Sequence, residues 1–376
     1  MKFIDEIDIK EKKVLFRFDF NVPFDSSRNI KDDTRIRAVL PSINYALDEN
    51  ARVIIMSHLG RPKGKVAPEM SLTPVAKRLS RLLGKEVQMA PDCTGEEVRK
   101  MIDALKPGCV LLLENLRFHK EEEKNDDGFA AELAGFAEVY IDDAFGNAHR
   151  VHASNVGITK FVRECGAGFL IKRELSYFKK ALDKPVRPFV AIVGGSKVSG
   201  KLEALGNLIR KVDKMIIGGG MAFTFLKALG YEVGKSIVED DLMEKAMEIM
   251  KTARELGVKL YLPIDCVMAE NMSAEAETKI VTVQEMNCHW MGLDIGPATI
   301  TLFTEVLGNA KTIVWNGPMG VFEIDAFGRG TAALAHSVAN SFALTIVGGG
   351  AFLVLLEGKV LPAVAALDRC NDTDQG

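Results

Sequence analysis

The sequence predicts an α/β protein built from two doubly wound, Rossmann-like lobes, each with a parallel sheet, joined by a helix. Short apolar runs alternate with longer amphipathic stretches, which is typical of buried parallel strands that alternate with helices. Because one sheet usually has about four to six strands, this number of runs indicates two sheets. The runs lie at residues 14–18, 52–56, 109–113, 139–141, 189–193, 214–217, 259–262, 312–315 and 344–347.

The helices between these runs carry their own signals. Residues 73–83 form an amphipathic stretch with Thr73 as the expected N-cap, Pro74 at the first helical position and Gly84 past the end. A second stretch, 170–182, follows the GAGF turn and precedes the helix breakers Pro185 and Pro188. We interpret it as the connection between a lobe at 1–168 and a lobe at 185–356, with the helix itself at 169–184.

Composition restricts the class of protein. The chain has 376 residues, 47% of them hydrophobic, and a formal charge of −3, so nothing attracts it as a whole to nucleic acid or to an anionic membrane. Its six cysteines are scattered without a C-x-x-C pair, which fits neither a zinc site nor a disulfide framework. There is no apolar leader and no spanning run. We therefore expect a soluble protein of the reducing cytoplasm, with no nucleic-acid or membrane partner.

In the first half, cationic and polar residues follow four predicted strands. Ligands of open parallel sheets bind beyond the carboxyl ends of the strands, so these residues should meet at one edge. A lone exposed arginine is usually just solvated, but convergence after four strands favours a site for a small, hydroxylated polyanion. His119, His289 and His336 are interpreted as structural or solvent-facing. Arg35, near a predicted helix start, could join the residues that follow these strands, which are Asp19, Asn21, His58, Arg61, Arg117, His149 and Arg150.

The second half places glycines after its strands, where backbone N–H groups can approach a phosphate closely. The string from Gly195 to Lys201 matches G-x-x-x-x-G-K, but Leu202 stands where a P-loop needs Ser or Thr. We expect Lys197 and Lys201 to lie four residues apart on an opening helical turn and to face a phosphate chain. No G-x-G-x-x-G fingerprint is present, which disfavours a dehydrogenase. This half therefore indicates a nucleotide site.

At this point long strings of residues resemble the phosphoglycerate kinase family, in family order over nearly the whole chain. The strings are FRFDFNVP, DDTRIRAVLPSI, SHLGRPKG, LLENLRFHKEEEKND, DDAFGNAHRVHAS, VGGSKVSGK, MIIGGGMAFTFLKALG, MGLDIGPATI and VWNGPMGVFE. The resemblance implies a glycolytic phosphotransferase that moves a phosphoryl group reversibly between ATP and the carboxyl group of 3-phosphoglycerate. It implies an N-terminal substrate lobe, a hinge helix, a C-terminal nucleotide lobe and a tail, 357–376, that returns to the first lobe.

The resemblance also implies a role for each matching residue. Asp19 and Asn21 resemble contacts to the substrate hydroxyl, and Arg35 resembles the arginine beside the reacting carboxylate. The contacts to the substrate phosphate would be His58, Arg61, Arg117 and Arg150. Lys197 resembles the lysine that follows the transferring phosphoryl group and Lys201 a phosphate-binding lysine, while Glu323 resembles the ribose contact. The rest of the nucleotide site would be Gly194, Gly195, Gly218, Gly219, Asn316, Pro318 and Val321.

The chemistry agrees with these residue types. A carboxylate is ionised near neutral pH and can attack the γ-phosphorus without a general base, so positioning and charge stabilisation are the tasks of the protein. The resemblance implies Mg²⁺ bound with the nucleotide, and closure about the hinge helix to bring the two ligands together. A coiled coil or apolar repeat is absent, which is compatible with a monomer.

One stretch departs from the family pattern. In the family, the strand that corresponds to residues 344–347 is followed by a glycine turn that leads to Asp-Thr at a helix start. A further strand and a Ser-Thr-Gly-Gly-Gly-Ala turn come next. Here Gly348, Gly349 and Gly350 lead directly into residues 351–359, which resemble the last segment. The missing Asp is the family's magnesium contact, so the residue that holds the metal is unknown.

Two explanations of this departure stay open. The block could be truly deleted, which predicts a catalytically impaired paralogue that keeps only the substrate site. Alternatively, the block could belong to the protein and be left out of the sequence. We favour the second explanation, because losing a strand and a helix from a packed sheet should cost more than the few kcal/mol by which domains are stable.

Overall fold

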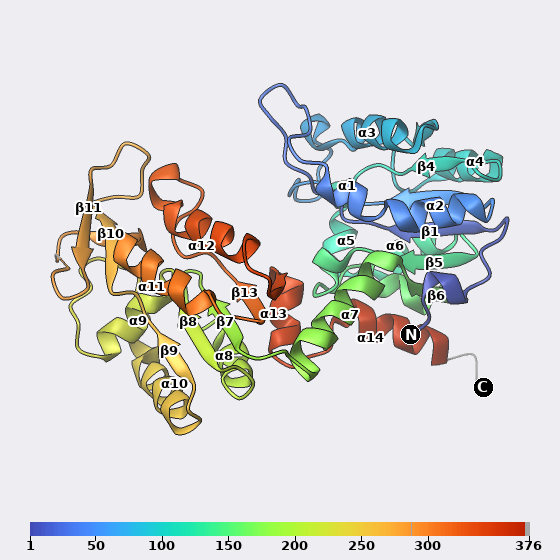
Figure 1. Cartoon of the computed structure of the whole chain (residues 1–376). Coiled ribbons are helices and arrows are strands. Elements are labelled where there is room, and N and C mark those ends of the chain that lie inside the picture. Colours follow the sequence, from blue (N-terminus) through green and yellow to red (C-terminus); the bar gives the residue numbers. More distant parts are fainter. Residues whose placement is uncertain (287, 373–376) are drawn as a thin grey trace. The chain divides into compact units, whose positions relative to one another are not determined.

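The computed structural model describes residues 1–286 and 288–372 and divides the chain into two compact units (Figure 1). The first unit comprises Met1–Ser176 together with the C-terminal segment from Val360, and the second comprises Tyr177–Lys359. Helix α7 (Phe169–Asp183) contains the point at which the chain passes from one unit to the other. Among the described residues, no helix is both long enough and apolar enough to cross a membrane.

The first unit is built on a parallel sheet of six strands in the order β3-β4-β2-β1-β5-β6. The four strands predicted in this half are confirmed as β1, β2, β4 and β5, because their apolar runs are buried on both faces. The runs at β3 and β6 are too short or too poor in apolar residues to be recognised. The strands are β1 Lys13–Arg17, β2 Arg52–Met56, β3 Val87–Met89, β4 Val110–Leu112, β5 Val139–Asp142 and β6 Glu164–Ala167.

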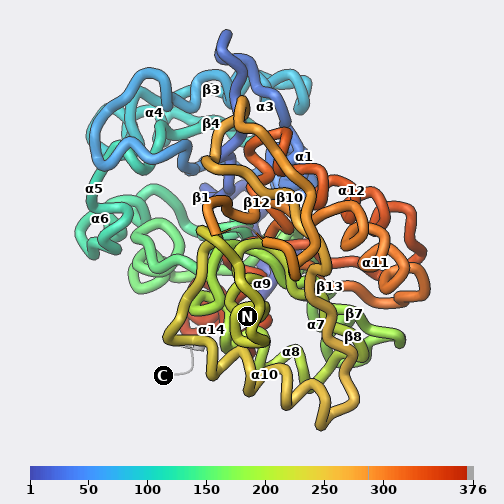
Figure 2. The backbone as a smooth tube through the Cα atoms, turned by 90° about the vertical axis from the view of Figure 1, so that its left-hand side faces the viewer, coloured from blue at the N-terminus to red at the C-terminus, as the bar shows by residue number. Residues whose placement is uncertain are grey.

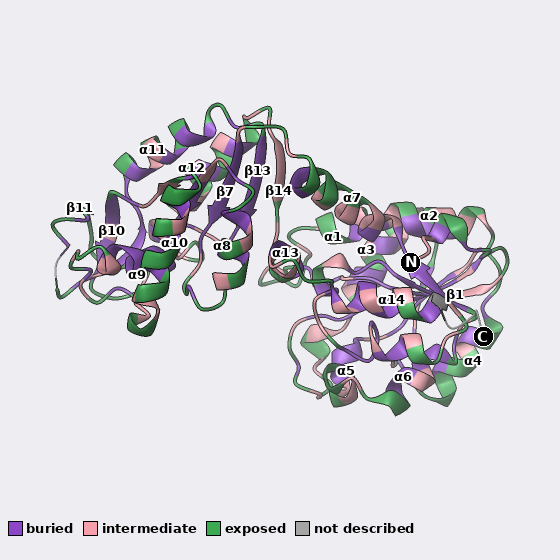
Figure 3. Cartoon of the chain, turned by 90° about the horizontal axis from the view of Figure 1, so that it is seen from below, coloured by how far each residue is buried: buried purple, intermediate pink, exposed green. Residues whose placement is uncertain are grey.

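Helices cover both faces of this sheet. Val14 and Phe16 of β1 pack with α1 (Thr34–Ala38), α2 (Leu40–Asp48) and α3 (Thr73–Leu83). Leu15, between them, faces α4 (Glu96–Ala104), α6 (Asp127–Ala134) and α14 (Pro362–Asp372) on the other side. Figure 3 shows the strands buried between helices whose outer sides are exposed. Helix α3 spans the predicted 73–83 and ends at Gly84 in the left-handed region, but its N-cap is Leu72 and not Thr73.

The expectation that no disulfide forms was wrong at one pair. Cys165 on β6 and Cys370 on α14 are bonded, with their Cα atoms 6.4 Å apart across a sequence separation of 205 residues. The pairing depends on the chain's last helix packing against β6, which cysteine spacing cannot show. Cys93, Cys109, Cys266 and Cys288 are free thiols.

The second unit is built on a parallel sheet of five strands in the order β14-β13-β7-β8-β9, and all five were predicted. One face packs on α8 (Leu202–Leu208), α9 (Met221–Ala228), α10 (Met243–Glu255) and α13 (Gly350–Leu356). The other packs on α11 (Pro297–Leu307) and α12 (Arg329–Ala339). The strands are β7 Phe189–Val193, β8 Lys214–Ile217, β9 Lys259–Tyr261, β13 Thr312–Asn316 and β14 Leu344–Val347.

A small antiparallel sheet in this unit was missed. Its order is β11-β10-β12, with β10 at Asp265–Ala269, β11 at Thr278–Thr282 and β12 at Met291–Ile295. Figure 2 shows β10 and β12 running beside each other. Phe223 and Leu226 of α9 pack against this sheet. Its outer strand, TKIVT, is mostly exposed and carries none of the apolar continuity that marks the buried strands.

Strand β14 forms the edge of the second sheet and is poorly covered. Its residues are partly exposed whereas those of the neighbouring β13 are buried, and Val347 is 64% exposed. The chain then passes through Gly348 and Gly349 directly into α13. An uncovered apolar edge is expected when a sheet lacks an outer strand. This is the place where the sequence lacks the family's block.

Candidate functional site

Asp19 and Asn21 lie at the carboxyl end of β1 and are tied to the neighbouring strand ends. Asn21 Oδ1 accepts a hydrogen bond from Gly60 N at 2.8 Å, just beyond β2. Asp19 Oδ2 forms an ion pair with Arg35 of α1. A Cβ at Gly146 would lie 2.7 Å from Asp19 Oδ2, so the turn after β5 can approach this carboxylate only because it carries glycine.

His58 is buried at the end of β2, and its surroundings fix its state. Burial, and next the positive charge of Arg17, hold the pKa of His58 well below its usual value, so the ring is neutral. Arg17 Nη2 lies 3.2 Å and Asn147 Nδ2 lies 3.3 Å from His58 Nδ1. Both groups can only donate, so Nδ1 accepts and Nε2 carries the proton. Nε2 is therefore a donor; Asp19 Oδ1 lies 3.9 Å from it.

Two arginines at this edge have buried donors without a hydrogen-bond acceptor. Arg117, in the 3-10 turn η3 (Leu116–Phe118), donates from Nη1 to Gly60 O at 2.7 Å, while its Nε has only an ion pair with Glu123 at 3.5 Å. Among the described residues, the buried Nε of Arg117 and Nε of Arg150 find no hydrogen-bond acceptor. An unsatisfied buried donor is costly unless a ligand completes it. These atoms therefore indicate an anion site.

Arg61 differs from the other candidates. It follows β2 as predicted but is exposed, and no hydrogen bond or ion pair of Arg61 occurs within the described residues. By contrast, the charges of Arg35 and Arg117 both act on His58, and that of Arg150 acts on Arg117. We define the first-unit site as the residues that the structure brings together, namely Asp19, Asn21, Arg35, His58, Arg117 and Arg150.

The sequence reasoning missed the buried network beneath this site. Arg17, fully buried inside β1, donates to Ser154 Oγ at 2.9 Å and to the carbonyl oxygen of Phe18. Glu122 is also fully buried and accepts from Ser154 N at 3.0 Å and from Ser154 Oγ at 2.6 Å. Burial alone would raise the pKa of Glu122, but the His152 side chain, then the charge of Arg17 and the hydroxyl of Ser154, hold it below its usual value. A charged residue inside an apolar strand run was the available signal for Arg17.

The second unit holds a cavity of about 730 Å³ at the carboxyl ends of β7, β8 and β13. Gly195 and Gly219 line it with φ angles of +110° and +67°, conformations that favour glycine. Apolar side chains make a second wall, from Phe223, Met291, Leu293 and Val321. Glycine turns and apolar side chains in the lining of one cavity suit the phosphates and the base of a nucleotide.

Lys201 lines this cavity and links the ends of β7 and β13 by hydrogen bonds. Its Nζ donates to Gly194 O at 2.6 Å, to Asn316 O at 3.0 Å and to Asn316 Oδ1. Burial lowers the pKa of Lys201 to about 8. The predicted helical turn was wrong, because α8 begins at Leu202 and both lysines precede it. Lys197 is exposed in that preceding loop.

The predicted nucleotide residues other than Lys197, which is exposed and does not line the cavity, divide into two groups. Gly194, Gly218 and Asn316 lie behind the cavity wall and hold the turns together; a Cβ at Gly194 would lie 2.1 Å from Pro318 O, and one at Gly218 would lie 2.4 Å from Met319 Sδ. Phe223, Asp294 and Met319 line the cavity and were missed. The predicted residues that line it are Gly195, Lys201, Gly219, Pro318, Val321 and Glu323.

The carboxylates of this cavity do not form a metal site. Asp294 accepts from Ile295 N at 2.9 Å through Oδ1 and from Gly330 N at 2.7 Å through Oδ2, and burial raises its pKa to about 6. Glu323 is exposed at the cavity's lining. Among the described residues, no three His, Cys, Asp or Glu ligand atoms close enough to share an ion occur at this cavity. The residues described around this cavity therefore do not fit a protein-held magnesium ion.

Comparisons with known proteins agree over nearly the whole chain. The sequence profile of the phosphoglycerate kinase family matches residues 4–360. A phosphoglycerate kinase of Geobacter metallireducens is 61% identical over 393 residues, covering 98% of this chain and 99% of its own. One of Aquifex aeolicus is 54% identical over 390 residues, covering 98% of each chain. Both aligned spans exceed the 376 residues present here, so these relatives carry residues without a counterpart.

Solved structures give the same result. The structure of phosphoglycerate kinase from Coxiella burnetii has a TM-score of 0.80 and 40% identity, covering 98% of this chain and 99% of its own. That from Pyrococcus horikoshii has a TM-score of 0.83 and 28% identity, covering 99% and 100%. The predicted α/β fold with two parallel sheets is confirmed by this similarity together with the strand order.

Proposed function

The chain belongs to the phosphoglycerate kinase family, and from this premise we propose that its first-unit site binds 3-phosphoglycerate while the second-unit cavity binds ATP or ADP. The family's reaction transfers the terminal phosphoryl group of ATP reversibly to the carboxyl group of 3-phosphoglycerate, giving 1,3-bisphosphoglycerate and ADP in glycolysis. The full-length match does not favour the alternative of a substrate-binding paralogue without catalysis.

The observation that carries the substrate assignment is the pair of buried arginine donors. Arg117 Nε and Arg150 Nε lack hydrogen-bond acceptors within the described residues. A phosphate group supplies pairs of oxygen acceptors that the planar fork of a guanidinium group can bind bidentately. The proton on His58 Nε2 adds a neutral donor, and Asp19 and Asn21 supply acceptors for the substrate hydroxyl. Arg61 would reach the substrate from its exposed position by a side-chain movement.

Transfer needs little covalent assistance from the protein. A carboxylate oxygen of 3-phosphoglycerate attacks the γ-phosphorus, and the bond from that phosphorus to the bridging oxygen of ADP breaks. We assign Arg35 to the reacting carboxylate and Lys197 to the moving phosphoryl group, whose charge both would stabilise. Both ligands must come within about 3–3.5 Å of each other, and we propose that bending at α7 achieves this.

Magnesium is proposed to arrive with the nucleotide, held by its phosphate oxygens. This ion would neutralise phosphate charge. The described residues of the cavity include no group of three ligand side chains that could hold this ion without the nucleotide. The remaining proposals are a cytoplasmic location and a monomeric state.

Titration calorimetry with each ligand separately tests the assignment of 3-phosphoglycerate to the first unit and of ATP to the second. Arg117→Ala should weaken binding of 3-phosphoglycerate by about tenfold or more and leave ATP binding unchanged, because its donors face only the first-unit site. Lys201→Ala should show the reverse pattern. Arg52→Ala, at the opposite end of β2, is the control and should change neither. Loss of ATP binding in Arg117→Ala, or binding of 3-phosphoglycerate without any ATP binding by the unmodified protein, would refute the proposal.

A further inference from the structure

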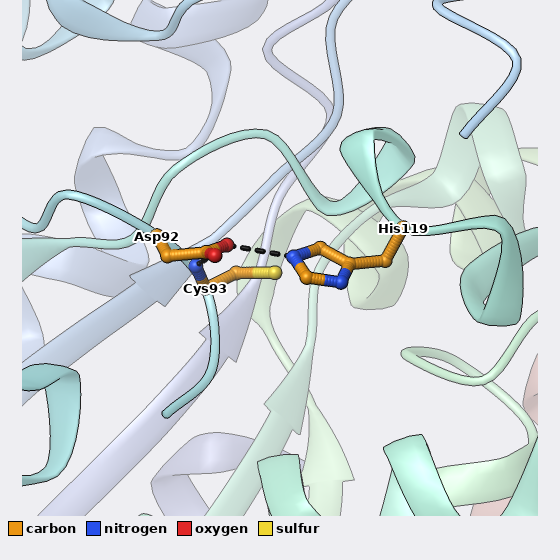
Figure 4. A group of neighbouring side chains, drawn as sticks. All are labelled: Asp92, Cys93 and His119. Carbon is orange, nitrogen blue, oxygen red and sulfur yellow. Dashed lines mark hydrogen bonds and ion pairs between the residues drawn. The ribbon is translucent and has the colours of Figure 1, made fainter. Parts of the chain in front are cut away.

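Three metal-ligating side chains meet in the first unit, and none of them is assigned to the reaction. Asp92 and Cys93 lie in the turn between β3 and α4, and His119 lies between η3 and α5 (Lys120–Lys124). Figure 4 shows the carboxylate and the sulfur facing the same side of the imidazole ring. One ligand atom from each residue lies within 4.8 Å of the others. Their spacing in sequence, with Cys93 and His119 26 positions apart, gave no sign of this proximity.

The surroundings hold these atoms in place. Cys93 is fully buried, and its backbone N donates to Asp92 Oδ1 at 2.6 Å. The ring of His119 stacks on Phe129 with a centroid distance of 5.4 Å, and its Nε2 lies 2.7 Å from Asp92 Oδ1. Glu114 N donates to the carbonyl oxygen of Asp92 at 3.2 Å. Ligand atoms that are fixed before the ion arrives lose little entropy on binding.

The group is also accessible to an ion. The side chains of Asp92 and His119 are 46% and 28% exposed. Asp92 lines a cavity of about 520 Å³ together with Glu114 and Phe118. An ion can therefore reach the carboxylate and the imidazole from solvent, and a water molecule can occupy a further coordination position.

We propose that Asp92, Cys93 and His119 bind one zinc ion, with water as the fourth ligand. Sulfur, imidazole nitrogen and carboxylate oxygen are the three ligand types that zinc takes, in sites that keep one position open. A thiol and an imidazole do not suit Mg²⁺ or Ca²⁺, which prefer oxygen ligands. This site is separate from the second-unit cavity and does not rest on the proposed function.

Binding replaces protons by metal bonds. The S–H bond of Cys93 breaks, the sulfur keeps the electron pair and donates it to zinc, and the proton passes to solvent. Burial raises the pKa of the Cys93 thiol well above its usual value, so without the ion the sulfur stays protonated. Asp92 and His119 exchange their mutual hydrogen bond for bonds to zinc. The proton on His119 Nε2 passes to solvent, and Nδ1 carries the proton of the neutral, zinc-bound ring. The competing explanation is a plain Asp92–His119 ion pair beside a packed thiol, and it predicts no metal binding.

Cobalt(II) serves as a spectroscopic probe for the zinc site in the full-length chain. The protein is stripped of metal with a chelator, kept reduced with a phosphine and titrated with Co²⁺ in the absence of nucleotide. We expect one equivalent of Co²⁺ to produce tetrahedral ligand-field bands together with a near-ultraviolet thiolate-to-cobalt charge-transfer band. One equivalent of Zn²⁺ should abolish both. A spectrum without the charge-transfer band would overturn the proposal.

Variants identify the ligands. Cys93→Ser should remove the charge-transfer band and weaken Zn²⁺ binding, measured by competition with a chromophoric chelator, by about tenfold or more. Cys109→Ser is the matched control, because Cys109 is a free thiol of the same unit outside the group, and it should bind like the unmodified protein. His119→Gln provides a second variant at a partly exposed position, in case Cys93→Ser does not fold; it should keep the charge-transfer band at an affinity also lowered about tenfold or more. Wild-type affinity in folded Cys93→Ser or in His119→Gln would overturn the proposal.

Discussion

Replacing Gly194 with alanine should damage the nucleotide cavity through steric contact alone. Gly194 N donates to Asn316 O at 2.9 Å and Gly195 N donates to Pro318 O at 2.9 Å, so the turn after β7 lies directly against the turn after β13. A Cβ at Gly194 would lie 2.1 Å from Pro318 O and 2.4 Å from Met319 Cε. Real Cβ atoms do not approach backbone oxygens this closely, so one of the two turns must move by about an ångström.

The size of the effect follows from overpacking. Forcing a methyl group into a packed region costs about 1–3 kcal/mol, and each 1.4 kcal/mol corresponds to about tenfold in affinity. If the turns after β7 and β13 move apart only when nucleotide binds, the cost is taken from binding and ATP affinity falls by up to about 100-fold. If they separate in the free protein, stability falls by the same free energy. The two losses together should amount to about 1–3 kcal/mol.

The assay combines ATP calorimetry with urea unfolding of the same variant. Gly200→Ala and Gly206→Ala are matched controls, because a Cβ at either position would have no atom within 4 Å. Gly206 lies inside α8, where alanine should stabilise the protein by up to about 1 kcal/mol. Unchanged affinity together with unchanged stability in Gly194→Ala would refute the packing argument.

The other predictions concern catalysis and pH. Lys197→Ala should lower kcat by about 100-fold with little change in substrate KM, because its ammonium is assigned to the transition state, whereas Arg61→Ala should raise the KM for 3-phosphoglycerate by about tenfold. Steady-state kinetics separate the two, and equal effects on kcat and KM in both variants would contradict the roles. Asp142 is buried, its Oδ2 has no partner among the described residues, and burial raises its pKa to about 7. The folded state thus holds a proton that the unfolded state releases near pH 4, so unfolding free energy should fall by up to about 4 kcal/mol as the pH rises from about 4 to 7. Urea unfolding of Asp142→Asn should show a flatter profile over that range, and an unchanged profile would exclude this group as the cause.

The sequence predicted the parallel sheets well for a physical reason. Strands such as Phe189–Val193 are buried on both faces, so their apolar residues are continuous and easily recognised. Strand β11 is mostly exposed and β6 has the sequence ECGA, so neither carries that pattern. The bond between Cys165 and Cys370 depends on long-range packing, which spacing along the chain does not encode.

Apart from Arg35 on α1, the first-unit site was predictable where side chains follow strand ends. Asp19, His58 and Arg117 do so, and the structure brings them together as the sheet rule predicts. Arg17 and Glu122 were missed because they lie beneath the site and not at a strand end. Glu122 belongs to the charged stretch KEEEK, which resembles a solvated surface helix, and only the charge of Arg17 within an apolar run gave a signal. The group around Cys93 was missed because one of its three members comes from a turn distant in sequence.

The measurement that tests the central claim most directly is a coupled assay of ATP-dependent phosphorylation of 3-phosphoglycerate by the purified chain. The account predicts turnover that saturates with both substrates and is abolished when a chelator removes Mg²⁺. It would be contradicted by a folded protein that binds 3-phosphoglycerate and shows no turnover with saturating ATP and Mg²⁺. That outcome would mean that the uncovered β14 edge marks a true loss of the nucleotide machinery.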